Sequence, residues 1–137
     1  MFSVDMFFDR FGDLDWIGVV VGTVVAMILG TLWYGPLFGK PWSRAVGVKM
    51  DSSPPPAKVV ATAVYMFGLN VGLAWWGVAD DFGHALVMAL ALGVLIVLPV
   101  LLSAVIWAKR SPLVLLIDVA HWFVIIAVCT FVQGLFV

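Results

Sequence analysis

Four long apolar stretches dominate the sequence, at about residues 16–34, 59–78, 85–108 and 113–137. Each has roughly the 20 residues that an α-helix needs to cross the hydrocarbon core of a bilayer. None has the charged face of a helix on the surface of a soluble protein, and none has the short alternating segments of a transmembrane β-barrel. The pattern predicts an all-α membrane protein, a bundle of four transmembrane helices that forms one domain over residues 16–137.

Two polar segments flank the predicted spans. Residues 1–15 are expected to lie on the outer membrane surface as a short helix, because charged residues alternate there with Phe2, Phe7, Phe8 and Phe11. Residues 35–58 form an amphipathic inner loop, in which Pro41 would open a short helix and Trp42 would anchor at headgroup depth. The run 51–54 is expected to be a helix-breaking segment, with Ser53 as a candidate N-cap of the second span. An ordinary flanking loop remains the alternative for both segments.

The charged residues separate into basic and acidic connections. Six of the seven basic residues lie in two loops: Lys40, Arg44, Lys49 and Lys58 in one, and Lys109 and Arg110 in the other. Six of the eight acidic residues lie elsewhere: Asp5, Asp9, Asp13 and Asp15 before the first span, and Asp80 and Asp81 after the second. Basic residues next to a membrane helix stay cytoplasmic, and two spans separate the two basic loops. Both loops are therefore expected inside, and both termini outside.

The composition narrows the classes of protein further. The chain has 137 residues, of which 64% are hydrophobic and 11% are charged. A soluble domain of this size exposes too large a fraction of its surface to solvent to bury that much apolar area. The sequence has no continuous basic face of the kind that binds nucleic acid. One cysteine, Cys129, excludes a disulfide within the chain and a cysteine metal cluster.

Asp118 is the one Asp, Glu, Lys or Arg inside the four predicted spans. A carboxylate in such a position costs about 3 kcal/mol on insertion scales and normally faces the protein interior or a wet cavity. His121 follows three residues later on the same helix face, and Cys129 and Gln133 continue this polar stripe. The fourth helix should therefore turn this side towards protein.

Two interpretations of Asp118 remain open. In one, Asp118 and His121 form a proton or ligand site. In the other, Asp118 bonds to Trp33, Tyr34 or a basic residue of the inner loop and locks the fourth helix to its neighbours. Because Trp33 and Tyr34 end the first helix at the inner side, we expect both to meet Asp118 in a small polar pocket there.

Smaller polar and glycine signals accompany this site. Asn70 in the second span is expected to hydrogen-bond to another helix within the buried polar site. Two pairs of glycines with GxxxG spacing allow close helix approach, and packing inside the four-helix unit is favoured over a contact between copies: Gly18 and Gly22, Gly68 and Gly72. Pro99 should interrupt the third span, because it cannot donate a hydrogen bond to the carbonyl of Leu95.

No catalytic constellation, phosphate-binding loop or metal-binding motif is present in the sequence. We therefore expect no catalytic residues, no metal site and no cofactor. A membrane-embedded enzyme remains a distant third possibility, behind a scaffold and a transporter.

Two motifs resemble the signature of the DUF1761 family. The first is the run Gly30–Trp42 (GTLWYGPLFGKPW), followed by Gly47, and the second is the turn Lys109–Pro112 leading to Leu116, Ile117 and Asp118. The resemblance covers nearly the whole chain. The chain departs from it after Asp118, where the family usually has a Gly-Tyr pair and this sequence has Ala120 and His121. The resemblance implies a small four-span protein in a bacterial inner (plasma) membrane and implies no activity.

Two functions are expected from these features. The first is a non-enzymatic accessory or scaffold subunit, in contact with membrane lipid, that packs against itself or against a larger membrane complex. The second is an oligomeric transporter or channel for protons or a small solute, which would use the Asp118 and His121 pair.

Overall fold

The computed structural model describes residues 3–50, 53–77 and 81–137. Over these ranges the chain has no strand, and 84% of the described residues are helical. The elements are α1 (Val4–Gly12), α2 (Trp16–Leu32), η1 (Trp33–Leu37), α3 (Gly39–Val46), α4 (Pro56–Trp76), α5 (Phe82–Leu92), η2 (Gly93–Val97), α6 (Leu98–Trp107) and α7 (Pro112–Gly134). Expectations for Phe2, Asp51, Ser52 and Asp80 lie outside the described residues.

Four helices are long and apolar enough to cross a membrane: Trp16–Leu37, Pro56–Trp76, Phe82–Trp107 and Pro112–Gly134. The prediction of an all-α protein with four such helices is confirmed. Polar residues cap three of them: the side chains of Asp15, Asp81 and Ser111 accept hydrogen bonds from backbone N–H groups at the starts of α2, α5 and α7.

Two predicted helix ends are wrong. The first span continues past Tyr34 and Pro36 to Leu37, because the chain widens into a π-helical turn in which the N–H of Phe38 donates to the carbonyl of Trp33 at 2.8 Å. Ser53 does not cap the second span. Pro55 precedes the helix without a side-chain cap, and Pro56 occupies the first turn, where a missing N–H costs nothing.

The third span is continuous but irregular. Its π-helical turn, η2, ends at Val97, two residues before Pro99, and the N–H of Leu98 donates to the carbonyl of Gly93. A wider turn of this kind absorbs the hydrogen bond that Pro99 cannot make. Ala85, Ala89 and Gly93 are buried on the side that packs against α7.

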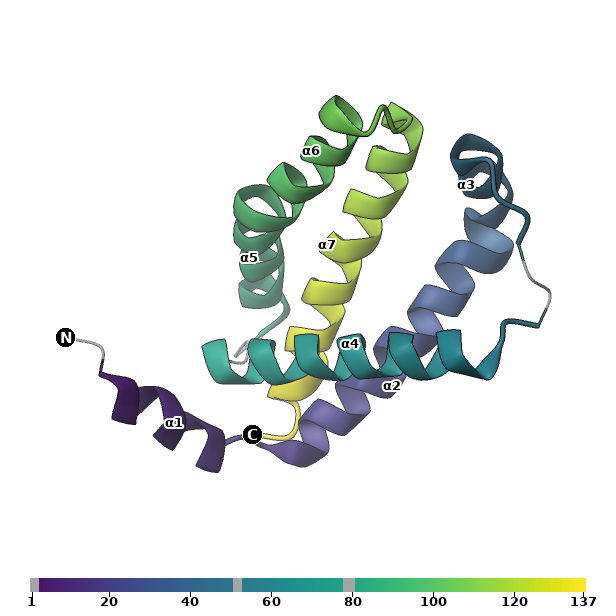
Figure 1. The fold of residues 1–137 in the computed structure, drawn as a ribbon. Coiled ribbons are helices and arrows are strands. Elements are labelled where there is room, and N and C mark those ends of the chain that lie inside the picture. Colours follow the sequence, from purple (N-terminus) through teal and green to yellow (C-terminus); the bar gives the residue numbers. More distant parts are fainter. Residues whose placement is uncertain (1–2, 51–52, 78–80) are drawn as a thin grey trace.

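The helices are arranged around α7. In its most apolar 18-residue segment 44% of the residues are buried, compared with 17–22% in the other three spans. α2 packs along one side of α7, and α5 and α6 pack along another (Figure 1). The main core joins buried residues of four helices: Ala26 of α2, Met66 and Leu73 of α4, Ala89 of α5, and Ile125, Ile126, Ala127 and Cys129 of α7.

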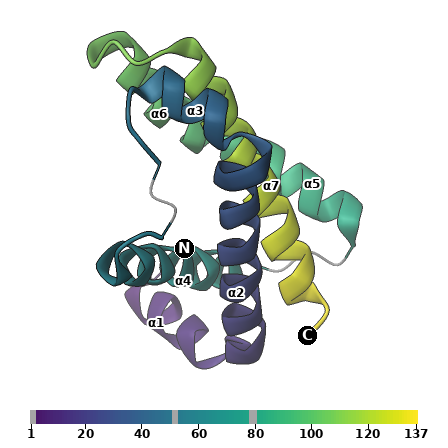
Figure 2. The ribbon, with the colours of Figure 1, turned by 90° about the vertical axis from the view of Figure 1, so that its right-hand side faces the viewer.

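α4 runs across α2 and α7 and not alongside them (Figure 1). In the view turned by 90°, α2 stands upright while α4 is seen largely along its own axis (Figure 2). The expected four-helix bundle is therefore not confirmed. α4 turns Met66, Asn70 and Leu73 towards the core and leaves its opposite face exposed.

α1 is held against the end of α4. The guanidinium of Arg10 donates to the carbonyl of Trp75 at 3.1 Å and lies 5.2 Å from the centre of its indole ring. The indole N–H of Trp75 in turn donates to the carbonyl of Phe7 at 3.0 Å. The helix expected in residues 1–15 thus forms, and that it lies on a membrane surface stays a prediction.

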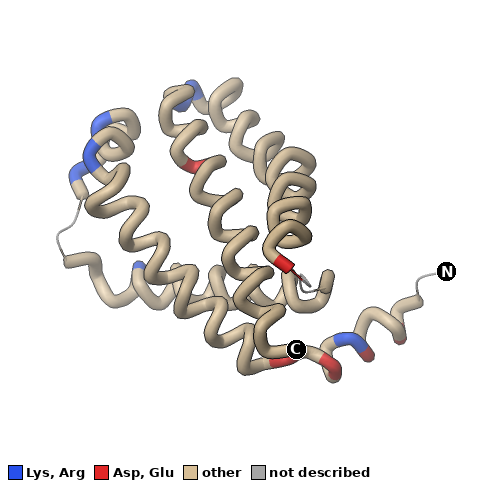
Figure 3. The backbone as a smooth tube through the Cα atoms, turned by 180° about the vertical axis from the view of Figure 1, so that it is seen from behind, with Lys and Arg blue, Asp and Glu red and all other residues tan. Residues whose placement is uncertain are grey.

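Charge separates along the molecule. Basic residues gather at the end formed by α3 and the α6–α7 connection, whereas most acidic residues lie at the opposite end, near α1 and the end of α7 (Figure 3). The exceptions are Arg10 in α1, Lys58 in the first turn of α4 and Asp118 within α7. Which end faces the cytoplasm stays a prediction.

The two predicted glycine pairs have different outcomes. A Cβ on Gly22 would collide with the carboxamide oxygen of Asn70, and a Cβ on Gly18 would meet Gln133 at 3.5 Å, so this pair packs inside the chain. Gly68 and Gly72 are exposed, with nothing within 4 Å of an added Cβ. The prediction of packing inside the chain is therefore wrong for Gly68 and Gly72, because α4 contacts the core with its opposite face.

The Gly22 contact predicts that substitution by alanine costs more stability at Gly22 than at Gly18. Gly22→Ala should lower the free energy of unfolding by about 1–3 kcal/mol, because the added methyl group displaces the Asn70 carboxamide. Gly18→Ala, one turn earlier on α2, should cost less than about 1 kcal/mol, because its contacts are at ordinary packing distance. Both variants gain the same helix propensity, so the difference between their unfolding free energies in detergent measures the contact. Equal stabilities would contradict it.

Candidate functional site

Asp118 lies half-buried on α7, and one of its oxygens accepts two hydrogen bonds. The hydroxyl of Tyr34 donates to Oδ1 at 2.6 Å, and the indole N–H of Trp42 donates to the same atom at 3.0 Å. These bonds tie α7 to η1 and to α3. Among the described residues no ion pair reaches Asp118, so the two aromatic donors supply the polar contacts of this carboxylate.

The local backbone explains how Tyr34 and Trp42, eight residues apart, both reach Oδ1 of Asp118. The π-helical turn carries the chain from Tyr34 to Phe38, and α3 then folds back against it, with the N–H of Trp42 bonded to the carbonyl of Phe38 at 3.0 Å. A Cβ on Gly39 would lie 2.5 Å from the carbonyl oxygen of Tyr34. Only glycine permits this close approach, so Gly39 is required to place Trp42 beside Asp118.

Trp33 takes a different partner from the one expected. Its indole N–H donates to the backbone carbonyl of Ile117 at 3.2 Å, one residue before Asp118. Its ring lies 4.6 Å from that of Phe38. Trp33 therefore lines the same region and stabilises the contact between η1 and α7 without touching the carboxylate.

His121 lies beside this group with both ring nitrogens buried and without a hydrogen-bond partner in the described part of the chain. The residue is 4% exposed, and its ring centre lies 4.9 Å from that of Tyr34 and 5.4 Å from that of Trp122. No hydrogen bond joins it to Asp118 over the described ranges. Buried polar groups without partners are rare and call for an unseen water, ion or functional role.

A second polar cluster lies towards the other end of α7. The side-chain N–H of Gln133 donates to Oδ1 of Asn70 at 2.7 Å, and the carboxamide of Asn70 donates to the carbonyl of Met66 at 2.9 Å. Cys129 reaches the carbonyl of Gly22 at 3.5 Å. Asn70 and Gln133 are almost fully buried, and Oε1 of Gln133 has no partner among the described residues.

The single buried polar site expected from the sequence is therefore two sites. Asp118, Tyr34, Trp33 and His121 come together, but Asn70 does not join them, because it bonds to Gln133 fifteen residues further along α7, or about 22 Å at 1.5 Å per residue. Sequence reasoning missed Trp42, which it assigned to the headgroup region. Gly39, three residues before it, was the available signal that α3 turns back towards the first span.

Neither cluster has the composition of a metal or catalytic centre. In the described ranges no group of three or more His, Cys, Asp and Glu side chains is placed to hold a metal ion. The carboxylate is held by two uncharged aromatic donors, Tyr34 and Trp42. What the arrangement can do is join helices, or hold and pass a proton along α7 if His121 acquires partners.

Comparison with protein families agrees with the two sequence motifs. The model of the family described as "Protein of unknown function (DUF1761)" matches residues 17–134, which covers both motifs and the four spans except Trp16. The chain belongs to the DUF1761 family. Searches of curated proteins and of solved structures find no match to this DUF1761 protein. Family membership therefore leaves its activity open.

The Asp118 bonds predict a specific loss of stability. Tyr34→Phe removes one of the two donors to the carboxylate and should lower the free energy of unfolding by about 1–2 kcal/mol. Tyr65→Phe is the matched control, because the side chain of Tyr65 is exposed on α4 and should change stability by less than about 0.5 kcal/mol.

A double-mutant cycle tests whether the effect passes through the carboxylate. In the Asp118→Asn background, Tyr34→Phe should cost less than in the wild type, with a coupling energy of about 1 kcal/mol measured by denaturation in detergent. Additive costs would mean that the hydroxyl of Tyr34 does not stabilise the protein through the Asp118 carboxylate.

Proposed function

We propose that this DUF1761 protein is a non-enzymatic subunit of a bacterial inner membrane that assembles with a second copy of itself through the exposed face of α4. The main support is the split between the two sides of α4. One side is bonded into the core through Asn70, while the other carries Gly68 and Gly72, where an added Cβ would meet no atom of the described residues within 4 Å.

The chemistry of this face favours another helix as the occupant. Glycines four residues apart let two membrane helices approach until their backbones touch, and exposed Val64 and Phe67 flank this stripe with apolar packing surface. A twofold axis lets one such face pair with its own copy, which is the commonest symmetry of oligomers. The other glycine pair is already used against Asn70 and Gln133.

The internal polar bonds fit a structural subunit. Asp118 and Asn70 connect α7 to α3, η1 and α4 through uncharged partners. Bonds of this kind hold the helices in one arrangement, so the exposed face of α4 is presented on a fixed support. This role needs no substrate and no cofactor.

Self-association in lipid tests the proposal. The wild type should associate at low protein-to-lipid ratio, and Gly68→Leu combined with Gly72→Leu should weaken association at least about tenfold, because the added side chains separate the backbones. Ala91→Leu, on the exposed face of α5, is the matched control and should change it less than about twofold. Energy transfer between labelled chains in vesicles gives the measurement.

Two outcomes would overturn this assignment. A wild-type protein that stays monomeric at all protein-to-lipid ratios removes the second copy as the occupant. Association that survives in the double leucine variant moves the interface away from α4.

A second candidate function, a proton or small-solute transporter, is favoured by the unpartnered nitrogens of His121. Polar side chains follow one side of α7 from Asp118 to Gln133, and Gln133 also lines a cavity of about 290 Å³ at the acidic end, together with Asp13 and Asp15. Ile125, which is fully buried, separates the two clusters. Transport would therefore require α2 and α7 to separate at this level.

Flux into liposomes tests this second candidate. If the candidate is right, the wild type should move protons or a small solute faster than protein-free vesicles, and Asp118→Asn should lower the rate at least about tenfold, while Tyr65→Phe leaves it unchanged. A rate and a pH dependence that do not change in Asp118→Asn would eliminate the relay.

A further inference from the structure

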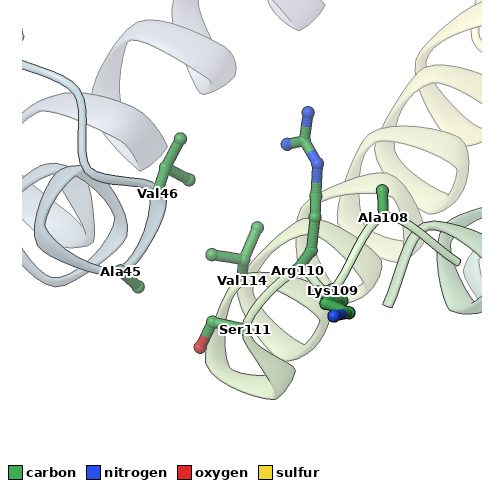
Figure 4. Close-up of a pocket in the computed structure, with 7 residues that line it drawn as sticks. All are labelled: Ala45, Val46, Ala108, Lys109, Arg110, Ser111 and Val114. Atoms are coloured by element: carbon green, nitrogen blue, oxygen red, sulfur yellow. The ribbon is translucent and has the colours of Figure 1, made fainter. Parts of the chain in front are cut away.

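A cavity of about 280 Å³ lies at the basic end of the molecule, outside both polar clusters. It separates the last turn of α3 from the connection between α6 and α7, and its lining residues are Ala45, Val46, Ala108, Lys109, Arg110, Ser111 and Val114. In Figure 4 the Arg110 side chain extends into the space between this connection and Val46. The cavity lies between α3 and the start of α7. Deeper in the protein these two helices are joined by the hydrogen bond from Trp42 to Asp118.

The lining carries positive charge without a compensating acid. Lys109 and Arg110 contribute two cations, no acidic side chain belongs to the lining, and over the described ranges neither cation takes part in an ion pair. The nearest acid along α7 is Asp118, one turn beyond Val114, and its Oδ1 is occupied by Tyr34 and Trp42. The N-terminus of α7, which Ser111 caps, adds a partial positive charge to the same place.

Apart from Ser111, the rest of the lining side chains are apolar. Ala45, Val46 and Val114 form walls that suit hydrocarbon, while the guanidinium of Arg110 suits a phosphate group, to which it can donate two parallel hydrogen bonds. α6 ends at Trp107 and α7 begins at Pro112, so the cations lie where two spans reach the membrane surface. Headgroups of lipids occupy this level.

We propose that this cavity binds the headgroup of an anionic phospholipid. Arg110 and Lys109 contact the phosphate, and Val46 and Val114 contact the glycerol and the first carbons of the acyl chains. Basic pockets between membrane helices recognise anionic lipids in this way. The lipid is favoured over free phosphate because the side chains of Ala45, Val46, Ala108 and Val114 add hydrocarbon to the lining. The site does not depend on either function proposed above.

Lipid retention by the full-length protein tests the site. The purified protein is equilibrated in detergent with equal amounts of phosphatidylglycerol and phosphatidylcholine, and the lipids that stay bound are counted by native mass spectrometry. The wild type should retain phosphatidylglycerol in preference to phosphatidylcholine. Lys109→Gln combined with Arg110→Gln should reduce this preference at least about tenfold.

Two further variants separate the effect of the cavity from that of general charge. Lys40→Gln combined with Lys49→Gln removes the same charge near the basic end without touching the lining, and should change the preference less than about twofold. Val46→Trp fills the cavity while keeping both cations, and should also lose the preference. Retention of the preference in both cavity variants, or equal loss in the Lys40 and Lys49 variant, would overturn the proposal.

Inorganic phosphate distinguishes the two sources of the anion. At millimolar concentration it should leave the bound phosphatidylglycerol in place, because it cannot replace the contacts with Val46 and Val114. Complete displacement of the lipid by phosphate would assign the site to a free anion and overturn the lipid as its ligand.

Discussion

The carboxylate of Asp118 fixes the arrangement of one end of this protein. An acid within a membrane helix costs about 3 kcal/mol unless partners replace the water it loses. Here both partners come from a stretch of nine residues, Tyr34 to Trp42, and both bind one oxygen. The chain can satisfy that atom from two sides only if the first span ends in a wide turn and α3 folds back on it. The π-helical turn and Gly39 follow from this requirement.

The other end of α7 is fixed by a different chemistry. Asn70 and Gln133 are uncharged, and they bond to each other and to the backbone within a nearly dry region. Such bonds contribute about 1 kcal/mol or less in a membrane, so their main effect is on geometry. Asn70 can reach Gln133 across Gly22 only because that position lacks a side chain. α4 is thereby held across α2 and α7, and its second face stays outside the core.

The sequence predicts the parts of the fold that depend on local composition. The four spans are found within a few residues of their observed ends, because an apolar length is a property of one segment. The meeting of Tyr34 with Asp118 also follows, since one buried acid near the end of a helix has few possible partners there. Helix direction is different. Hydropathy gives the length of α4 but not its tilt, which neighbouring helices determine, so the crossing of α4 and the exposure of Gly68 and Gly72 could not be predicted. Trp42 was missed for the same reason, because its contact depends on how α3 folds back.

The groups that remain without partners suggest where function lies. Asp118, Asn70 and one side of Gln133 are already committed to bonds that hold helices together, and using them for chemistry would first require breaking those bonds. His121 is different, since both of its nitrogens are free within the described structure and Asp118 is one turn away. The exposed side of α4 and the basic cavity are available without any rearrangement. Because separating α2 from α7 would break the contact of Cys129 with the Gly22 carbonyl and the packing of Gly18 against Gln133, an activity based on surfaces requires less change in this protein than one based on a path through its core.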